Sequence, residues 1–289
     1  MLGCRVAAFL RLLHLPPVFG RQILYGEQTS ATNTPNLTVA VRSISIALQQ
    51  RLAQATAVAE SAMPNFGAEI GHVGQVPTEV TILRSLANAS GVRTVCEIGF
   101  AGGHSAVVWL DGLTTRTFEF DLLALRYSNA SRAFIEETYP GRVRFHPGNS
   151  AITVPAFSRE MALAREACDL WFVDGAHGFQ WPRQDMLAAL SVLRHGGMLV
   201  ADDCTPRFHR VQEAWRMLVR ERLVNEWSDL CQTQTLPAPV GLKGWCVGQF
   251  NASVCDHAAP PRICRVLERI RRDGAAPSKH RGLKEKKRG

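Results

Sequence analysis

Short apolar runs alternate with amphipathic stretches between residues 78 and 205. The apolar runs end in glycine-rich or acidic turns, and the stretches between them repeat apolar residues at helical spacing. Buried strands that alternate with helices are typical of a parallel sheet with helices on both faces. The pattern therefore predicts an α/β fold built on a doubly wound, mostly parallel sheet.

The same pattern gives approximate bounds for the elements. Pro77 opens one helix at its first turn, where a proline costs no hydrogen bond, and Gly91 ends it. In the helix expected at 180–194, the apolar spacing directs Met186 inward and Asp185 outward. We expect core strands at 92–97, 116–120, 142–146, 169–173 and 198–201, with helices at 104–110, 122–137, 158–167, 180–194 and 207–223.

Composition divides the chain into four parts. Residues 1–36 contain arginines but no acid before Glu27, which is typical of a leader or of a transit-like targeting segment for an organelle; a cytoplasmic chain with a disordered leader fits equally. Residues 37–74 form a helical extension, residues 75–256 the main domain, and residues 257–289 a basic tail that we expect to be disordered. No apolar run reaches the length of a transmembrane helix.

The net charge of +8 belongs to the tail. Residues 262–289 hold eleven basic and three acidic residues, so the rest of the chain is balanced. A general nucleic-acid-binding surface on the main domain is therefore unsupported, and the tail is either a solvated end or a recruiting element. Of the eight cysteines, we expect Cys96, Cys168 and Cys204 to be buried thiols near strands. The late cysteines at 231, 246, 255 and 264 can pair in an oxidising compartment.

A glycine-rich turn follows the first core strand. Gly99, Gly102 and Gly103 lie between that strand and a helix, where the backbone can approach a ligand and the helix presents free N–H groups. Glu97 stands near the end of the strand, and Asp121 closes the next strand, a place where an acid commonly holds a ribose. Together these residues indicate a nucleoside-containing cofactor.

The segment Glu97-Ile98-Gly99-Phe100-Ala101-Gly102-Gly103 resembles the first motif of class I S-adenosylmethionine-dependent methyltransferases, with Ala101 in place of the middle glycine. Cys168 to His177, ending in Asp174-Gly175-Ala176-His177, and Leu193 to Asp203, ending in Asp202-Asp203, are similar to the fourth and fifth strands of the small-molecule O-methyltransferases. That branch includes catechol and macrolide-sugar O-methyltransferases. The resemblance implies a seven-stranded Rossmann-like sheet, closed by antiparallel strands within 231–250, and a small-molecule substrate.

The resemblance assigns cofactor binding to two groups of positions. Gly148-Asn149-Ser150 follows the third strand, and Asn149 replaces the acid that the family usually has there. The expected S-adenosylmethionine-binding residues are Glu97, Gly99, Gly103, Ser105, Asp121, Asn149 and Ser150.

Three carboxylates are expected to converge at the ends of the fourth and fifth strands. Asp174 ends one strand and Asp202 with Asp203 ends the next, and neighbouring parallel strands lie about 4.8 Å apart. Oxygen ligands select Mg²⁺ or a similar divalent cation, and the resemblance places a metal at these positions. The alternative is that the three acids cap helices or pair with arginines.

His177 is the expected catalytic base, because it follows Asp174 by three residues, where the catechol enzymes carry a lysine base. His104, after the glycine turn, is expected to cap or pack. Two other functions stay open. An inactive binding module is favoured by Ala101 and Asn149, and a protein or nucleic-acid methyltransferase is favoured by the basic tail. The oligomeric state is not indicated.

Overall fold

The computed structural model of the chain describes residues 44–70, 72–237, 241–257, 260 and 262–273. The expected leader, residues 1–36, and residues 274–289 of the basic tail lie outside the described residues. No helix in the described ranges is long and apolar enough to cross a membrane.

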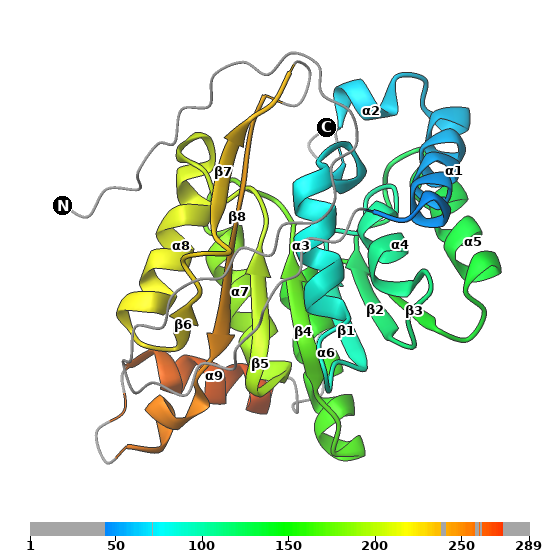
Figure 1. Ribbon diagram of the computed structural model, residues 1–289. Helices are drawn as coiled ribbons and strands as arrows, with labels where there is room; N and C mark the ends of the chain where they lie inside the picture. The colour runs from blue at the N-terminus through cyan, green and yellow to red at the C-terminus, as the bar shows by residue number, and fades with distance from the viewer. Residues whose placement is uncertain (1–43, 71, 238–240, 258–259, 261, 274–289) are drawn as a thin grey trace, which may run out of the picture. The chain divides into compact units, whose positions relative to one another are not determined.

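The architecture is a mixed sheet of eight strands (Figure 1). The strands are β1 (Thr94–Ile98), β2 (Arg116–Asp121), β3 (Val143–Pro147), β4 (Cys168–Val173), β5 (Leu193–Ala201), β6 (Val224–Glu226), β7 (Gln232–Thr235) and β8 (Leu242–Phe250). Seven of them follow the order β3-β2-β1-β4-β5-β8-β6, and β7 pairs with β8 beside this path. The first five are parallel, and β8 runs antiparallel to β5, β6 and β7. The expected doubly wound, mostly parallel sheet is confirmed, with β7 as an addition.

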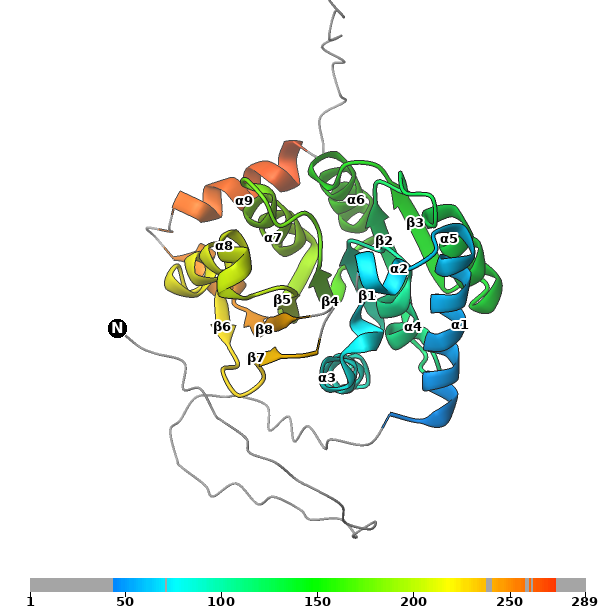
Figure 2. The same ribbon diagram turned by 90° about the horizontal axis from the view of Figure 1, so that it is seen from above.

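Helices cover both faces of the sheet (Figure 2). The α-helices are α1 (Ile46–Ala62), α2 (Phe66–Glu69), α3 (Pro77–Ala87), α4 (His104–Leu110), α5 (Ser128–Thr138), α6 (Ser150–Ala164), α7 (Trp181–Val192), α8 (His209–Arg220) and α9 (Arg262–Asp273). Helices α1, α3, α4 and α5 pack together, and α6, α7, α8 and α9 pack together on the opposite face. This arrangement leaves the carboxyl ends of the parallel strands as the edge where a ligand can reach the sheet.

The third helix of the core starts earlier than its apolar spacing predicts. Helix α6 begins at Ser150 rather than at 158, because the side chain of Asn149 caps it: Asn149 Oδ1 accepts a hydrogen bond of 2.9 Å from the amide of Ala151. The sequence reading placed Asn149 in a cofactor loop and so overlooked its role as a helix cap.

The expectation of a disordered tail is wrong for residues 262–273. Helix α9 occupies them, and Ile263, Cys264 and Leu267 are buried against the main core. These residues lie on one side of the helix at spacings of one, three and four, while its arginines occupy the other positions. The high charge of this segment predicts disorder, whereas the spacing of its apolar residues predicts a helix, and the expectation followed the charge.

The cysteine expectations need a second correction. Cys96 on β1 bonds to Cys168 at the start of β4, and Cys204, just after β5, bonds to Cys246 on β8. A third disulfide joins Cys255 to Cys264. Cys96, Cys168 and Cys204 are therefore in disulfides and are not thiols. They are bonded because the sheet order places strands side by side that are distant along the chain. The disulfide of Cys204 fixes the end of β5 to β8, beside the acids of interest.

Candidate functional site

The glycine turn between β1 and α4 takes the strained form that a close approach requires. Gly99 has φ +100° and Gly103 has φ +77°, and a Cβ at Gly99 would overlap the carbonyl oxygen of Asp174 on the neighbouring strand. The turn is thus held directly against the end of β4. Ala101 adopts φ +45°, the left-handed region that suits the glycine it replaces.

Glu97 and Ser105, both expected at the cofactor, lie inside the protein. Glu97 is fully buried, accepts a hydrogen bond from the hydroxyl of Ser105, and accepts another of 2.8 Å from the indole of Trp109. In this structure the pair fastens β1 to α4 beneath the turn. Direct contact of either residue with a cofactor stays a prediction.

Glu97 also faces a second buried acid. It lies opposite Glu119 in the register of β1 and β2, and both side chains are buried completely. Burial, together with the charge of the other acid, raises the pKa of Glu97 well above its ordinary value. Burial raises the pKa of Glu119 to about 7. A proton is therefore held between these strands under conditions where free carboxyl groups are ionised.

Glu119→Gln is expected to remove a pH dependence of stability. Between about pH 4.5 and about 7 the folded protein holds a proton at Glu119 that the unfolded chain has released, so raising the pH lowers the free energy of unfolding. The variant should exceed the wild-type protein by roughly 3 kcal/mol above that range. Urea unfolding from pH 5 to pH 9 measures it, with the exposed Glu136→Gln as control. Parallel profiles for Glu119→Gln and the wild-type protein would refute the expectation.

Asp121 reaches from the end of β2 to the glycine turn. Its Oδ2 accepts a hydrogen bond of 3.2 Å from the amide of Ala101, and its Oδ1 accepts one of 2.7 Å from the amide of Leu123. The side chain is half-buried, so one face of the carboxylate lies open beside the turn. The hydroxyl of Ser150 points elsewhere, because it donates to Asp185 Oδ1 at 2.6 Å.

Exposed apolar side chains gather at the same edge of the sheet. Leu122 and Leu125 follow β2, Ile152 follows β3, and Phe179 with Trp181 follows β4. Phe179 is 75% exposed, although large apolar residues favour the interior. Apolar residues at the carboxyl ends of successive strands are suited to hold a flat or apolar ligand there.

The three expected acids come together as the sequence predicts. Asp174 follows β4, and Asp202 and Asp203 follow β5. The two strands are parallel and pair as far as Val173 and Ala201, the residues just before these acids. Burial and the charge of Asp202 raise the pKa of Asp174 to about 7. The pKa of Asp203 is also raised, by burial and by Asp202. Asp203 has φ +53°, so this acidic turn is strained like the glycine turn.

His177 joins the acids. Its Nε2 lies 3.1 Å from Asp203 Oδ2 and 3.7 Å from Asp174 Oδ1. Its ring packs against Phe208, with 4.3 Å between the ring centroids. Burial lowers the pKa of His177, but the hydrogen bond and charge of Asp174 and the other two acids outweigh it and raise that pKa overall. The His177 side chain is 31% exposed, but its Nε2 is buried against the two acids, so the Nδ1 side of the ring is the side that a hydroxyl compound could meet.

A lysine that the sequence reading missed completes the cluster. Lys243 on β8 places its ammonium on Asp202 Oδ2 and 3.2 Å from Asp203 Oδ1, with 14% of its side chain exposed. Burial lowers its pKa, but the surrounding carboxyl groups raise it well above the ordinary value, so it is a cation. Composition could have singled out this residue, because Lys243 is the single lysine among residues 1–278.

A buried acid from the N-terminal half borders the cluster. Glu79 on α3 is completely buried, and its pKa is raised well above the ordinary value by burial and by the charge of Asp202. Both effects favour the uncharged form of Glu79 in the folded protein.

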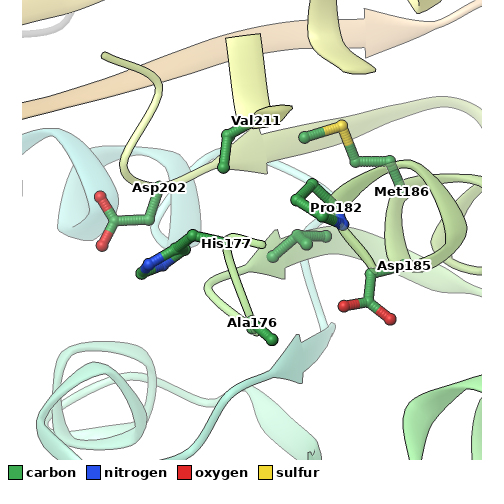
Figure 3. Close-up of a pocket in the computed structure, with 9 residues that line it drawn as sticks. Ala176, His177, Pro182, Asp185, Met186, Asp202 and Val211 are labelled. Carbon is green, nitrogen blue, oxygen red and sulfur yellow. The ribbon is translucent and has the colours of Figure 1, made fainter. Parts of the chain in front are cut away.

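A pocket lies beneath the loop that carries His177 (Figure 3). It is a small hollow, with room inside for about one water molecule, and Pro182, Met186 and Val211 form its apolar wall. Asp185 also lines it and is 3% exposed, so the expectation that Asp185 points outward is wrong. Its hydrogen bond to Ser150 explains the inward orientation, because the bond satisfies a buried polar group.

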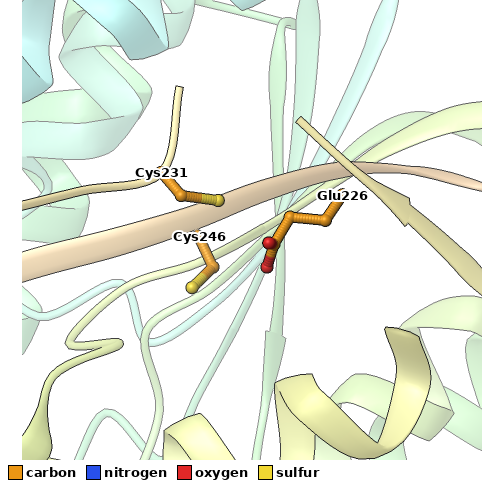
Figure 4. Close-up of side chains that lie close together, drawn as sticks. All are labelled: Glu226, Cys231 and Cys246. Carbon is orange, nitrogen blue, oxygen red and sulfur yellow. The ribbon is translucent and has the colours of Figure 1, made fainter. Parts of the chain in front are cut away.

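Two further clusters of polar side chains, one around His104 and one around Cys231, are not part of the site formed by His177 and the acids. His104 is buried, its Nε2 lies 2.8 Å from the hydroxyl of Thr56, and its ring stacks on His72 at 3.6 Å, which confirms a packing role. Cys231 lies beside Glu226 and Cys246 (Figure 4). Because Cys246 is bonded to Cys204, its sulfur is not a thiolate for a metal.

Comparisons with known proteins agree with this geometry. A protein-family model described as a methyltransferase domain matches residues 96–204. The fold is similar to that of cofactor-bound Rv0187 from MTB, with 19% identity, a TM-score of 0.55 and coverage of 70% of this chain and 89% of that chain. It is similar to the O-methyltransferase from Bacillus cereus solved with SAH, with 18% identity, a TM-score of 0.54 and coverage of 72% and 92%.

A third solved structure with this fold is the O-methyltransferase TomG from Streptomyces achromogenes, involved in tomaymycin synthesis and solved with SAM. It has 18% identity and a TM-score of 0.53, and the match covers 73% of this chain and 92% of that chain. The curated proteins contain no match to the sequence.

Proposed function

We propose that this protein is an S-adenosylmethionine-dependent methyltransferase that transfers the methyl group to a hydroxyl oxygen of a small molecule. Residues 96–204 match a family model described as a methyltransferase domain, and the fold is similar to that of O-methyltransferases solved with SAH or SAM. The observation that carries the proposal is the position of His177, 3.1 Å from Asp203 at the carboxyl edge of the sheet and next to the end of the glycine turn. A base at this edge suits a hydroxyl acceptor, which must lose a proton as it is methylated.

The cofactor would lie across the ends of β1 and β2. The amides of the Gly99–Gly103 turn and of the start of α4 face its amino-acid end, and the open face of Asp121 accepts its ribose hydroxyls. Leu122 and Ile152 would flank the planar base of the cofactor, and contact with this base would account for the exposure of both side chains. Asn149 and Ser150 contribute the loop that leads into α6.

The transfer is a direct displacement. The acceptor oxygen attacks the methyl carbon, a C–O bond forms as the C–S bond breaks, and S-adenosylhomocysteine leaves. The hydroxyl proton passes to Nδ1 of His177, and Asp174 and Asp203, which face the buried Nε2, stabilise the imidazolium that forms. Holding both reactants at one edge converts a bimolecular encounter into a reaction within one complex.

A metal-assisted form of the same transfer is the second candidate. Donor atoms of Asp174, His177 and Asp203 all lie within 4.8 Å of one another, a set that suits a divalent cation such as Mg²⁺. Such an ion would lower the pKa of a bound hydroxyl. In this structure Lys243 and the amide of Asp203 each contact one oxygen of Asp202, so a metal set that includes Asp202 would require Lys243 to move.

A methyl-transfer assay tests the proposal. The protein is incubated with methyl-labelled S-adenosylmethionine and a panel of catechols, phenols and sugar alcohols, and products are identified by mass spectrometry. We expect an O-methylated product together with S-adenosylhomocysteine. Label on added protein or nucleic acid, lost on removal of residues 274–289, would favour the rival function of the tail. Cofactor binding with no turnover on any acceptor class would favour the inactive binding module.

A further inference from the structure

We infer that Lys243 is the resident cation of this site, and that its ammonium takes the place a divalent metal ion would have at the Asp202–Asp203 pair. Applied to the reaction, this inference rests on the proposed function: methyl transfer would then proceed without a metal. As a statement about cation binding it can be tested without cofactor or substrate.

The contacts of Lys243 carry the inference. Its nitrogen contacts Asp202 and lies 3.2 Å from Asp203, so one cation already bridges the two acids that follow β5. A divalent ion on Asp203 would lie close to this ammonium, and two positive charges at such a distance repel strongly in a partly buried site. Metal binding therefore requires that Lys243 leave the pair.

The fold holds Lys243 in place. Strand β8 extends beyond the end of β5 and pairs with β7, where Lys243 lies opposite Gln234. The amide of Cys204 donates to the carbonyl of Gly244 at 2.8 Å, and the Cys204–Cys246 disulfide joins the same two segments. A Cβ at Gly244 would come within 2.9 Å of the carbonyl oxygen of Gln232, so this close approach needs glycine. Contacts of the residues on both sides of Lys243 in the sequence thus hold its ammonium against Asp202 and Asp203.

The choice of residue agrees with this role. The chain uses arginine almost throughout, and only Lys243 among residues 1–278 is lysine. An ammonium is a compact point charge with three N–H donors, so it can stand where a metal ion would lie between two acids. The planar guanidinium of arginine needs more room. Two of its donors face Asp202 and Asp203, and a third N–H remains for an acceptor oxygen that becomes negative as it loses its proton.

The test is direct binding of Mn²⁺, measured by calorimetry and by electron paramagnetic resonance on the full chain. Lys243→Ala is expected to bind one Mn²⁺ saturably, whereas the wild-type protein should bind it at least tenfold more weakly and not saturate over the same range. Adding Asp203→Asn to Lys243→Ala should abolish the site. Arg210→Ala, which removes an exposed cation paired with Glu213, is the matched control and should behave as the wild-type protein does.

Two results would overturn the inference: saturable Mn²⁺ binding by the wild-type protein that Asp203→Asn removes, or no gain of binding in a folded Lys243→Ala variant. If Lys243→Ala does not fold, Lys243→Met keeps the bulk of the side chain and Mn²⁺ should restore part of its lost thermal stability; failure to do so counts equally against the inference. Because S-adenosylmethionine is absent from these titrations, a failure of the proposed function would appear separately.

In a turnover assay the same variant gives a second readout. We expect chelators to leave the wild-type rate unchanged, whereas Mn²⁺ or methylammonium should raise the rate of Lys243→Ala. A merely structural lysine would allow no such rescue. Loss of wild-type turnover on chelation would assign the cation role to a metal instead.

Discussion

His177→Ala is expected to lower the rate of methyl transfer by about 10²–10⁴-fold while cofactor affinity changes little. The imidazole faces the Asp174 and Asp203 carboxylates from the loop after β4, and its unprotonated form can take the proton of the acceptor. Removing it leaves the acceptor hydroxyl with no group of suitable pKa to take its proton. Single-turnover rates with an identified acceptor measure the effect, and His209→Ala on the exposed start of α8 is the control.

The pH profile separates this role from a structural one. The base must be neutral, so the wild-type rate should rise with pH through an apparent pKa above 6.5, the direction in which the neighbouring acids move the pKa of His177. Because Asp174 titrates nearby with a pKa of about 7, the apparent value belongs to the pair. In His177→Ala this rise should disappear. An unchanged profile, or a loss of less than about tenfold, would show that another group accepts the proton.

Gly99→Ala is expected to lower the free energy of unfolding by about 3–5 kcal/mol, from the left-handed backbone and from overlap with a fixed carbonyl. Its φ of +100° disfavours any side chain, and the added Cβ would meet the carbonyl oxygen of Asp174. Relief requires β1 and β4 to move apart, which also displaces the turn that we propose binds the cofactor. The variant should therefore lose affinity for S-adenosylmethionine as well as stability.

Urea unfolding measures the effect, and Gly178→Ala is the matched control. Gly178 lies in the loop after β4, and a Cβ there would meet nothing within 4 Å, so that change should fall within about 0.5 kcal/mol of the wild-type protein. Equal effects of the two substitutions would mean that the contact between the turn and β4 does not constrain the site.

The fold was predictable because local patterns specified it. Apolar runs and glycine turns placed the five parallel strands within a few residues of their observed positions, and the acids at the ends of β4 and β5 converge because neighbouring parallel strands end at one edge. Helix α4 matches its expected bounds of 104–110. These features depend on periods of a few residues, which a single sequence contains.

Contacts between distant segments were not predictable in the same way. Lys243 follows the acids by about forty positions and reaches them only because β8 turns back over the end of β5. The Cys96–Cys168 disulfide requires the knowledge that β1 and β4 are neighbours. Asp185 reads as an outward residue from spacing alone, whereas a hydrogen bond from Ser150 on another helix turns it inward. In each case a partner far along the chain determines the role.

The central claim, that the glycine turn and Asp121 bind S-adenosylmethionine, is tested most directly by calorimetric titration of the wild-type protein with this compound. We expect one saturable site per chain, competed by S-adenosylhomocysteine, and a weakening of about 1–3 kcal/mol in Asp121→Ala, since a polar contact to the ribose would be lost. The exposed Glu137→Ala on α5 should bind as the wild-type protein does. A folded wild-type protein that binds no S-adenosylmethionine, or an Asp121→Ala variant with unchanged affinity, would contradict it.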